Sequence, residues 1–327
     1  RERTGGDGAG AGQRKGCGMK RYSREIAVAS ALGAMLLALA IWAPAFYQPQ
    51  PLLSFLTRQA PALVVACGMA LVIITREIDI SVGSQFSVCS VAAGLLAAAG
   101  WPLAAVLPAA IGIGAVLGAV NGALVAGLGL PSIVVTLATM VTLRQGLNVI
   151  RQGVFVNLPD GVQWLGLSQK AGQWALVGAA LAILIGLALA LRGLAAGRQI
   201  YAVGSNAEAA RLAGVRPRRV TFAVFAAMGA LTGLAAMMNL VQSPQVQPLS
   251  GSGLELTVIA AVVVGGVSIN GGRGNLAGVF AGLMLLACAA PALTYLHIEA
   301  YWEKAIQGSI ILLAIVAERL RAGKVGP

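Results

Sequence analysis

The sequence predicts an all-α polytopic membrane protein with about ten transmembrane helices and both termini in the cytoplasm. Of its 327 residues, 58% are hydrophobic and only 10% are charged, and the mean hydropathy is +0.83. A soluble domain usually carries about 25% charged residues. The charges stand in short segments between apolar runs, the distribution that the positive-inside rule describes. The net charge of +12 therefore does not indicate a nucleic-acid partner.

Ten apolar stretches carry this prediction, because a helix needs about 20 residues to cross the hydrocarbon core of a bilayer. They cover residues 26–46, 60–75, 80–99, 103–127, 132–150, 174–191, 220–242, 254–269, 276–296 and 302–317. We expect a disordered basic leader over residues 1–25, a transmembrane domain over 26–318 and a cytoplasmic tail over 319–327. Met19 begins a short basic run, so residues 1–18 are interpreted as a dispensable extension.

The distribution of basic residues predicts the orientation. With ten spans and a cytoplasmic N-terminus, most of the 23 Lys and Arg residues fall on the cytoplasmic side. The exceptions are Arg58, Arg144, Arg151, Lys170 and Lys304. Because cytoplasmic loops carry an excess of Lys and Arg, this arrangement is favoured over an odd number of spans.

The stretch Thr75–Ser84 places three charges, Arg76, Glu77 and Asp79, between two apolar runs. A charge at the centre of a membrane helix costs about 3 kcal/mol. The stretch must therefore lie at a water-facing end of a span or line a polar pathway inside the protein. We expect Asp79 to pair with Arg76 and hold the break together.

A second apolar run ends in a polar break over Ser268–Asn275. Paired interrupted segments are typical of a transport site between two repeats, although two ordinary cytoplasmic turns would give the same pattern. Small residues recur at helix-contact spacing and predict a tightly packed bundle. They are Gly114, Gly118 and Gly122, then Gly229 with Gly233, and Gly278 with Gly282.

The longest polar interior loop runs from Arg192 to Arg219. Ser205 or Asn206 can cap a short helix over Ala207–Ala213, which Gly214 would close. Gly204 and Gly214 bracket this helix and can take the turns that it needs. A helix this short is not stable alone in water, so we expect it to dock on something. The alternative is a surface loop with a charged face.

The four cysteines, Cys17, Cys67, Cys89 and Cys288, form no C-x-x-C pair, and His297 is the single histidine. A disulfide framework, a zinc site and a haem site are therefore not predicted. No G-x-x-x-x-G-K-[ST] motif occurs in the chain, so it is not expected to hydrolyse ATP by that route.

Five blocks of the sequence together resemble a known family. They are Gly68–Ser84, Asn121-Gly122, Ser132–Gly146, Gly197–Val215 and Gly251–Gly274. They resemble the permease subunits of bacterial sugar-importing ABC transporters of the ribose, arabinose and xylose type, from about Ile26 to the C-terminus. One departure is Arg76-Glu77, where the family commonly has two small residues. An Arg at that place is similar to the branch that imports rhamnose or autoinducer-2.

The resemblance implies a membrane-spanning permease subunit of an ATP-driven monosaccharide importer in the bacterial inner membrane, without its own ATPase and without a cofactor. Residues 26–318 would form the permease domain. The implied partners are a cytoplasmic ATP-binding subunit, a periplasmic sugar-binding protein, membrane lipid and a second permease subunit, identical or different.

The candidate site residues fall into two groups. The substrate pathway is expected to include Asp79, Ser81, Gly83, Ser84, Asn121, Thr136, Asn148, Asn239 and Glu255. Neutral polar side chains suit sugar hydroxyls, because they form weak contacts that release readily. The candidates for coupling to the ATPase are Gly204, Asn206, Glu208, Arg211, Leu212 and Gly214. Many of the polar residues could instead bond a neighbouring helix.

An ion-coupled secondary transporter of a small polar solute is the main alternative. It would use ionisable residues in the membrane, for which Glu77, Asp79, Arg144 and Glu255 are available. The ordered loop at 197–215 has no purpose in that mechanism. An intramembrane enzyme is more distant, because Ser81 and Ser84 lack a suitable histidine or lysine partner. A channel is also more distant, because no ring-forming filter motif is visible.

Overall fold

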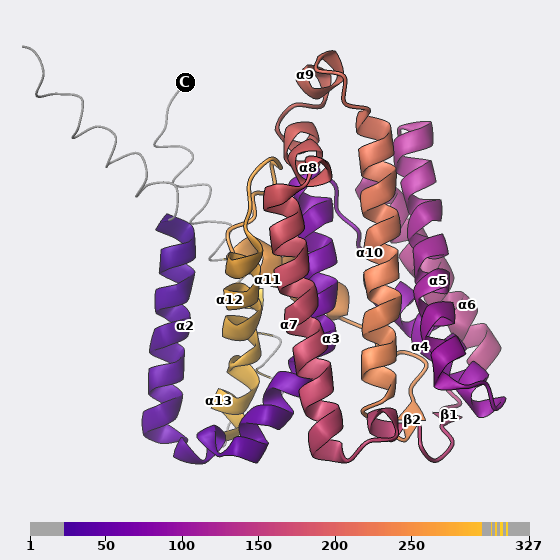
Figure 1. Cartoon of the computed structure of the whole chain (residues 1–327), viewed down its shortest axis with the longest axis vertical. Helices are drawn as coiled ribbons and strands as arrows, with labels where there is room; N and C mark the ends of the chain where they lie inside the picture. The colour runs from indigo at the N-terminus through magenta and orange to yellow at the C-terminus, as the bar shows by residue number, and fades with distance from the viewer. Residues whose placement is uncertain (1–22, 296–301, 303–304, 306–307, 310–311, 313–327) are drawn as a thin grey trace, which may run out of the picture.

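The computed structural model describes residues 23–295, 302, 305, 308–309 and 312. Its first half contains α2 (Ser23–Trp42), η1 (Pro44–Tyr47), α3 (Pro49–Ile74), α4 (Val82–Ala98), α5 (Leu103–Gly122), the π-helical turn η2 (Ala123–Gly127), α6 (Ser132–Arg151), η3 (Gln163–Gly166) and α7 (Gln169–Gly193). Its second half contains α8 (Ala195–Ser205), α9 (Ala207–Leu212), α10 (Pro217–Leu240), α11 (Leu254–Val264), α12 (Leu276–Ala287) and α13 (Ala289–Tyr295). Figure 1 shows the long helices side by side in one bundle.

Within the part of the chain that the structure describes, six helical segments are long and apolar enough to cross a membrane. They are Pro49–Ile74, Leu103–Gly127, Ser132–Arg151, Gln169–Gly193, Pro217–Leu240 and Leu276–Thr294, and three shorter apolar helices cover Ala27–Trp42, Val82–Ala98 and Leu254–Val264. Nine of the ten predicted stretches thus coincide with described helices. Most of the tenth, 302–317, and the tail 319–327 lie outside the described residues, as does nearly all of the leader. The count of ten therefore stays a prediction.

The first long helix after α2 begins earlier than predicted. We expected it over 60–75, but α3 begins at Pro49, where proline at the first helical position is favourable because its missing N–H has no intrahelical acceptor. The polar side chains of this early part are used in packing against α7. Gln50 donates to Gln173 at 3.1 Å, and Gln173 donates to Ser54 at 3.3 Å.

Two late stretches are shorter or broken. The stretch predicted over 254–269 ends as α11 at Val264, because Gly265 packs against the backbone of Gly278 and Gly266 has φ +90°. The stretch predicted over 276–296 is divided at Cys288 into α12 and α13. The predicted all-α fold also gains one strand pair, in which β1 (Val156–Asn157) is antiparallel to β2 (Gln245–Val246).

The glycine spacing has a direct structural role. Gly114 and Gly118 on α5 pack against the backbone of α10 at Gly229 and Gly233, so closely that a Cβ atom at any of the four would overlap a carbonyl oxygen. Gly282 on α12 similarly packs against α11. These approaches give the helices van der Waals contact, which holds helices together where no hydrophobic driving force acts between them.

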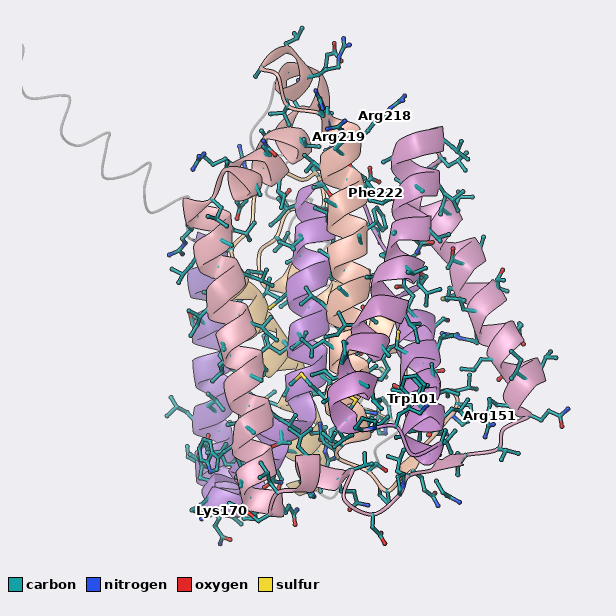
Figure 2. All side chains as sticks on the ribbon, turned by 45° about the vertical axis from the view of Figure 1, so that its right-hand side comes forward. Trp101, Arg151, Lys170, Arg218, Arg219 and Phe222 are labelled. Carbon is teal, nitrogen blue, oxygen red and sulfur yellow. The ribbon has the colours of Figure 1, made fainter. Side chains whose placement is uncertain are left out.

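The two ends of the bundle differ. The short helices α8 and α9 lie at one end, together with the start of α2, and the β1–β2 pair lies at the other (Figure 1). We call these the α9 end and the β end. Arg218 and Arg219 lie at the α9 end, whereas Arg151 and Lys170 lie at the β end (Figure 2). The helix α6 lies at an edge of the bundle (Figure 1), and only 17% of its most apolar 18-residue stretch is buried inside the protein.

Candidate functional site

The segment between α3 and α4 is a structured break in the helical run. The Arg76 N–H donates to Ile73 O at 2.9 Å and the Glu77 N–H donates to Val72 O at 3.1 Å, which is the bond pattern of a Schellman motif. Arg76 has φ 68°, a left-handed conformation that glycine adopts without strain and arginine does not. The conformation explains why small residues suit this position.

Asp79 is fully buried and its partners are neutral side chains. Its Oδ1 accepts hydrogen bonds from the backbone N–H and the hydroxyl of Ser81, at 2.9 and 2.5 Å, and its Oδ2 accepts from Gln85 at 3.2 Å. The prediction that Asp79 pairs with Arg76 is wrong. Arg76 is exposed at the surface, so its charge cannot follow the carboxylate into the interior.

Ser81 extends this network to two further helices. Its Oγ accepts hydrogen bonds from Gln85 at 2.7 Å and from Asn121 on α5 at 2.8 Å. The carbonyl of Asn121 accepts in turn from Thr139 on α6 at 2.7 Å. The network therefore joins the break, α4, α5 and α6 through polar side chains that are buried except for the partly exposed Thr139. The Oε1 atom of Gln85 is buried and has no hydrogen-bond partner among the residues that the structure describes.

One face of α6 carries a row of contacts at four-residue spacing. The Ser132 hydroxyl accepts from Ile78 N–H at 3.2 Å, and the Thr136 hydroxyl accepts from Ile80 N–H at 3.1 Å. One turn further along, the Met140 carbonyl accepts from the Ser84 hydroxyl at 2.9 Å. Residues four apart lie on the same helix face. The row therefore anchors the irregular backbone of the break against α6.

The row ends at an ion pair. Arg144 on α6 lies 3.2 Å from Oε1 of Glu255 in the first turn of α11, and the two side chains are 28% and 8% exposed. The other oxygen, Oε2, is buried, has no hydrogen-bond partner in the described part of the chain, and lies where a Cβ atom of Gly83 would be. Gly251 packs on Gly83 in the same place. Two glycines thus leave room for a carboxylate between α4 and α11.

Seven of the nine predicted pathway residues, from Asp79 to Glu255, lie in this connected region. The other two do not. Asn148 bonds Gln145 on its own helix at 3.2 Å near the surface, and Asn239 lies near the end of α10. Sequence reasoning missed the roles of Gln85, Ser132 and Thr139. Ser132, Thr136 and Arg144 are separated by multiples of four residues, which indicates one helix face and could have predicted the row.

Comparison with known proteins identifies the family. Residues 52–315 match the family model described as the permease component of the branched-chain amino acid transport system. The chain belongs to this family. It is 35% identical over 301 residues to the autoinducer 2 import system permease protein LsrC of Enterobacter sp. (strain 638), covering 91% of this chain and 88% of the relative. No solved structure matches the chain.

Two further relatives have similar coverage. The ribose import permease protein RbsC of Escherichia coli (strain K12) is 31% identical over 280 residues, which cover 84% of this chain and 87% of the relative. The probable ABC transporter permease protein y4mJ of Sinorhizobium fredii is 30% identical over 309 residues, which cover 93% and 92%. The predicted resemblance to sugar-importing ABC permeases is confirmed, and the chain is a multi-pass membrane permease.

At the α9 end of the permease, α8 is held tightly against the end of α3. A Cβ atom at Gly204 would overlap the Ile74 carbonyl oxygen, which also accepts a hydrogen bond from Gly272 N–H at 2.9 Å. The Tyr201 hydroxyl donates to Gly274 O at 2.8 Å. We expected Gly204 to serve as a turn, but it lies in the last turn of α8 and permits a close approach instead. The two polar breaks therefore meet α8 at one place.

The short helix α9 has the predicted cap and covers Ala207–Leu212. The Asn206 side chain accepts hydrogen bonds from Glu208 N–H and Ala209 N–H, both at 3.0 Å. Glu208 and Arg211 pair in two hydrogen bonds, at 2.6 and 3.1 Å, on the exposed surface. The Leu212 side chain is 79% exposed. Gly214 follows with φ +84°, as predicted for the closing residue.

Proposed function

We propose that this permease forms the translocation pathway of an ATP-driven importer of a monosaccharide or a similar small polyhydroxyl compound. The observation that carries the proposal is the polar column that runs from Asp79 along α6 to the Arg144–Glu255 pair. Buried polar groups are costly inside a membrane and mark pathways or sites there. Hydroxyl and amide groups suit the many hydroxyl groups of a sugar.

The column offers both fixed and adaptable groups. Asp79 is held by three hydrogen bonds and is fully buried, so it acts as the anchor that keeps the break in shape. Arg144 is partly exposed, and none of the described residues bonds Oε2 of Glu255 or Oε1 of Gln85. These groups are available to a hydroxyl-bearing solute when the helices separate. The relatives' names, ribose and autoinducer 2 import, support this class of substrate.

We infer that α9 receives work from a separate ATP-binding subunit. A capped helix with an internal ion pair moves as one body, and its exposed Leu212 gives an apolar contact. The close contact of Gly204 with Ile74 would pass that movement to the end of α3 and so to the break that contains Asp79. The path from the coupling surface to the polar column is thus short and formed by packed backbone.

The remaining assignments follow from the same proposal. The α9 end would face the cytoplasm, because Arg216, Arg218 and Arg219 begin α10 there. The membrane would be the bacterial inner membrane. A sugar-binding protein would deliver the substrate at the β end, and a second permease subunit would complete the pathway. The protein would be a transport subunit and not an enzyme.

Uptake of radiolabelled sugars by cells that carry the permease and its ATPase tests the proposal. We expect uptake to be lost when the ATPase is inactivated and to persist for a short time after a protonophore is added. Uptake that survives loss of the ATPase but collapses with the protonophore would instead establish the ion-coupled alternative. Ribose, rhamnose and autoinducer-2 are the substrates to compare.

A further inference from the structure

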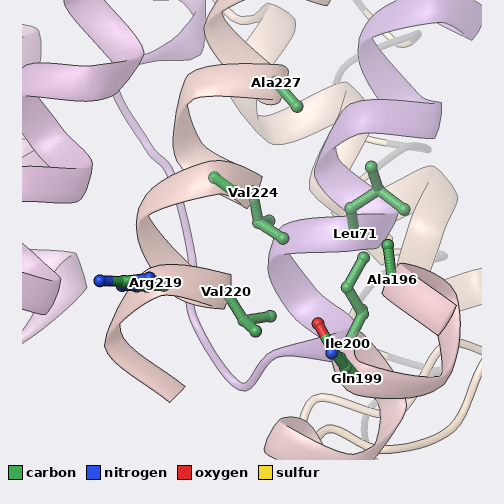
Figure 3. Close-up of a pocket in the computed structure, with 9 residues that line it drawn as sticks. Leu71, Ala196, Gln199, Ile200, Arg219, Val220, Val224 and Ala227 are labelled. Atoms are coloured by element: carbon green, nitrogen blue, oxygen red, sulfur yellow. The ribbon is translucent and has the colours of Figure 1, made fainter. Parts of the chain in front are cut away.

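An apolar cavity of about 310 Å³ lies between α3, α8 and α10 near the α9 end (Figure 3). Its interior is formed by aliphatic side chains, among them Leu71, Ile200, Val220, Val224 and Ala227. The volume is at the lower end of the range of small-molecule pockets, about 300–1,000 Å³. The cavity is therefore large enough for part of a flexible chain.

Among the described residues, the polar side chains that border the cavity are Gln199 on α8 and Arg219 on α10. Both residues are exposed, and the Arg219 guanidinium group is directed away from the aliphatic interior (Figure 3). Arg219 forms no ion pair with any of the described residues. It lies in the first turn of α10, where the partial positive charge of the helix end adds to its own.

The polarity of the cavity matches one kind of ligand. Arg219 lies at the outer end of the lining and Ala227 eight residues further along α10, which corresponds to about 12 Å of helix. The charge is thus at the end of the bundle, and the apolar surface extends toward its middle. A phospholipid has the same order of groups: an anionic phosphate at the membrane surface and an acyl chain below it.

We propose that the cavity binds an anionic phospholipid, with an acyl chain along Val220, Val224 and Ala227 and the phosphate at the outer end of the lining, beside Arg219. Basic residues beside openings between transmembrane helices attract anionic headgroups. The site lies beside α8, which contacts the end of α3. The membrane orientation is that of the proposed function, but lipid binding itself does not depend on transport.

Native mass spectrometry of the purified permease after incubation with dioleoylphosphatidylglycerol or dioleoylphosphatidylcholine tests the proposal. Arg219→Gln is expected to retain phosphatidylglycerol about fivefold less, which corresponds to the ~1 kcal/mol that one basic residue contributes at a membrane surface. Arg218→Gln is the matched control, because it removes the same charge from an adjacent exposed residue that does not border the cavity. It is expected to retain the lipid as the unmodified protein does.

A second variant tests the cavity without changing the charge. Ala223→Phe places a ring among the lining side chains and is expected to lower retention of phosphatidylglycerol as strongly as Arg219→Gln. Glycerol 3-phosphate, which has the phosphate but no acyl chain, is expected not to compete. Equal losses in Arg218→Gln and Arg219→Gln, equal retention of the two lipids, full competition by glycerol 3-phosphate, or unchanged retention in Ala223→Phe would each overturn the proposal.

Discussion

Arg144 and Glu255 join α6 to α11 through an ion pair of 3.2 Å, although 111 residues separate them in the sequence. The carboxylate occupies space that Gly83 and Gly251 leave open, and its Oε2 atom has no hydrogen-bond partner among the described residues. The pair therefore forms the end of the polar column that is nearer to the β end, where α6 terminates at Arg151. Any movement that separates α6 from α11 would break this pair.

Neutralising one member of this pair is expected to cost more than neutralising both. Arg144→Gln leaves the buried Glu255 carboxylate without a counter-charge, a loss of about 3 kcal/mol or more for a buried pair. The double variant Arg144→Gln/Glu255→Gln removes both charges and should lie closer to the unmodified protein. Thermal unfolding of the four proteins in detergent measures the cycle. Additive losses would show that the two groups do not interact.

Asp79→Asn is expected to abolish uptake while the protein still inserts into the membrane. The amide has nearly the same shape, and its N–H group can donate to the unpartnered Oε1 of Gln85 if the glutamine amide turns over. The packing is therefore preserved while the charge is lost. Asp79→Leu, which keeps none of the three hydrogen bonds, is expected to lower the yield of folded protein. Near-normal uptake by Asp79→Asn would show that the charge is dispensable.

Two glycines on the same helix offer a matched test of close packing. A Cβ atom at Gly114 would overlap the Gly229 carbonyl oxygen, whereas Gly112 has open space around it. Gly114→Ala is expected to lower the free energy of unfolding by about 1–3 kcal/mol through overpacking. Gly112→Ala should be neutral or slightly stabilising, because alanine is the better helix former. Equal melting temperatures for the two variants would exclude the close α5–α10 contact.

The apolar runs and the caps made much of this fold predictable. Nine predicted stretches became helices, and Asn206 caps α9 with the expected Gly214 after it. A cap is a local feature, since its donors and acceptors lie within four residues. The same holds for the glycine spacing on α5 and α10, which indicates a helix contact even though it does not say which helices meet.

What could not be predicted depends on contacts between distant segments. Asp79 was expected to use its near neighbour Arg76, but the chain reverses in such a way that Arg76 stays exposed and Gln85 becomes the partner. The role of Gly204 follows only from its contact with Ile74, 130 residues earlier. Sequence alone also gave no sign that Thr139 bonds Asn121.

Gly204→Ala is expected to uncouple the permease without unfolding it. The added methyl group would overlap the Ile74 carbonyl oxygen and push α8 away from the end of α3, while the long helices keep their contacts. Gly193→Ala is the control, because nothing lies within 4 Å of a Cβ atom there. The measurement is sugar-stimulated ATP hydrolysis by the reconstituted complex. Stimulation that is equally retained in both variants would mean that the α8–α3 contact carries no coupling.

Leu212→Asp tests whether α9 is the surface that meets the ATP-binding subunit. The Leu212 side chain is 79% exposed, so the substitution is expected to leave folding and insertion unchanged. In a complex with the ATPase, the new carboxylate would be buried without a partner, which costs several kcal/mol. We expect the ATPase to be lost from pull-downs and uptake to fail.

The conservative variant Leu212→Met keeps an apolar side chain of similar volume and should behave as the unmodified protein. If the ATPase still co-purifies with Leu212→Asp at full yield and uptake is unchanged, α9 is not the coupling surface. The Asn270–Asn275 turn, which packs on the same end of α3 through Gly272, is then the next surface to test.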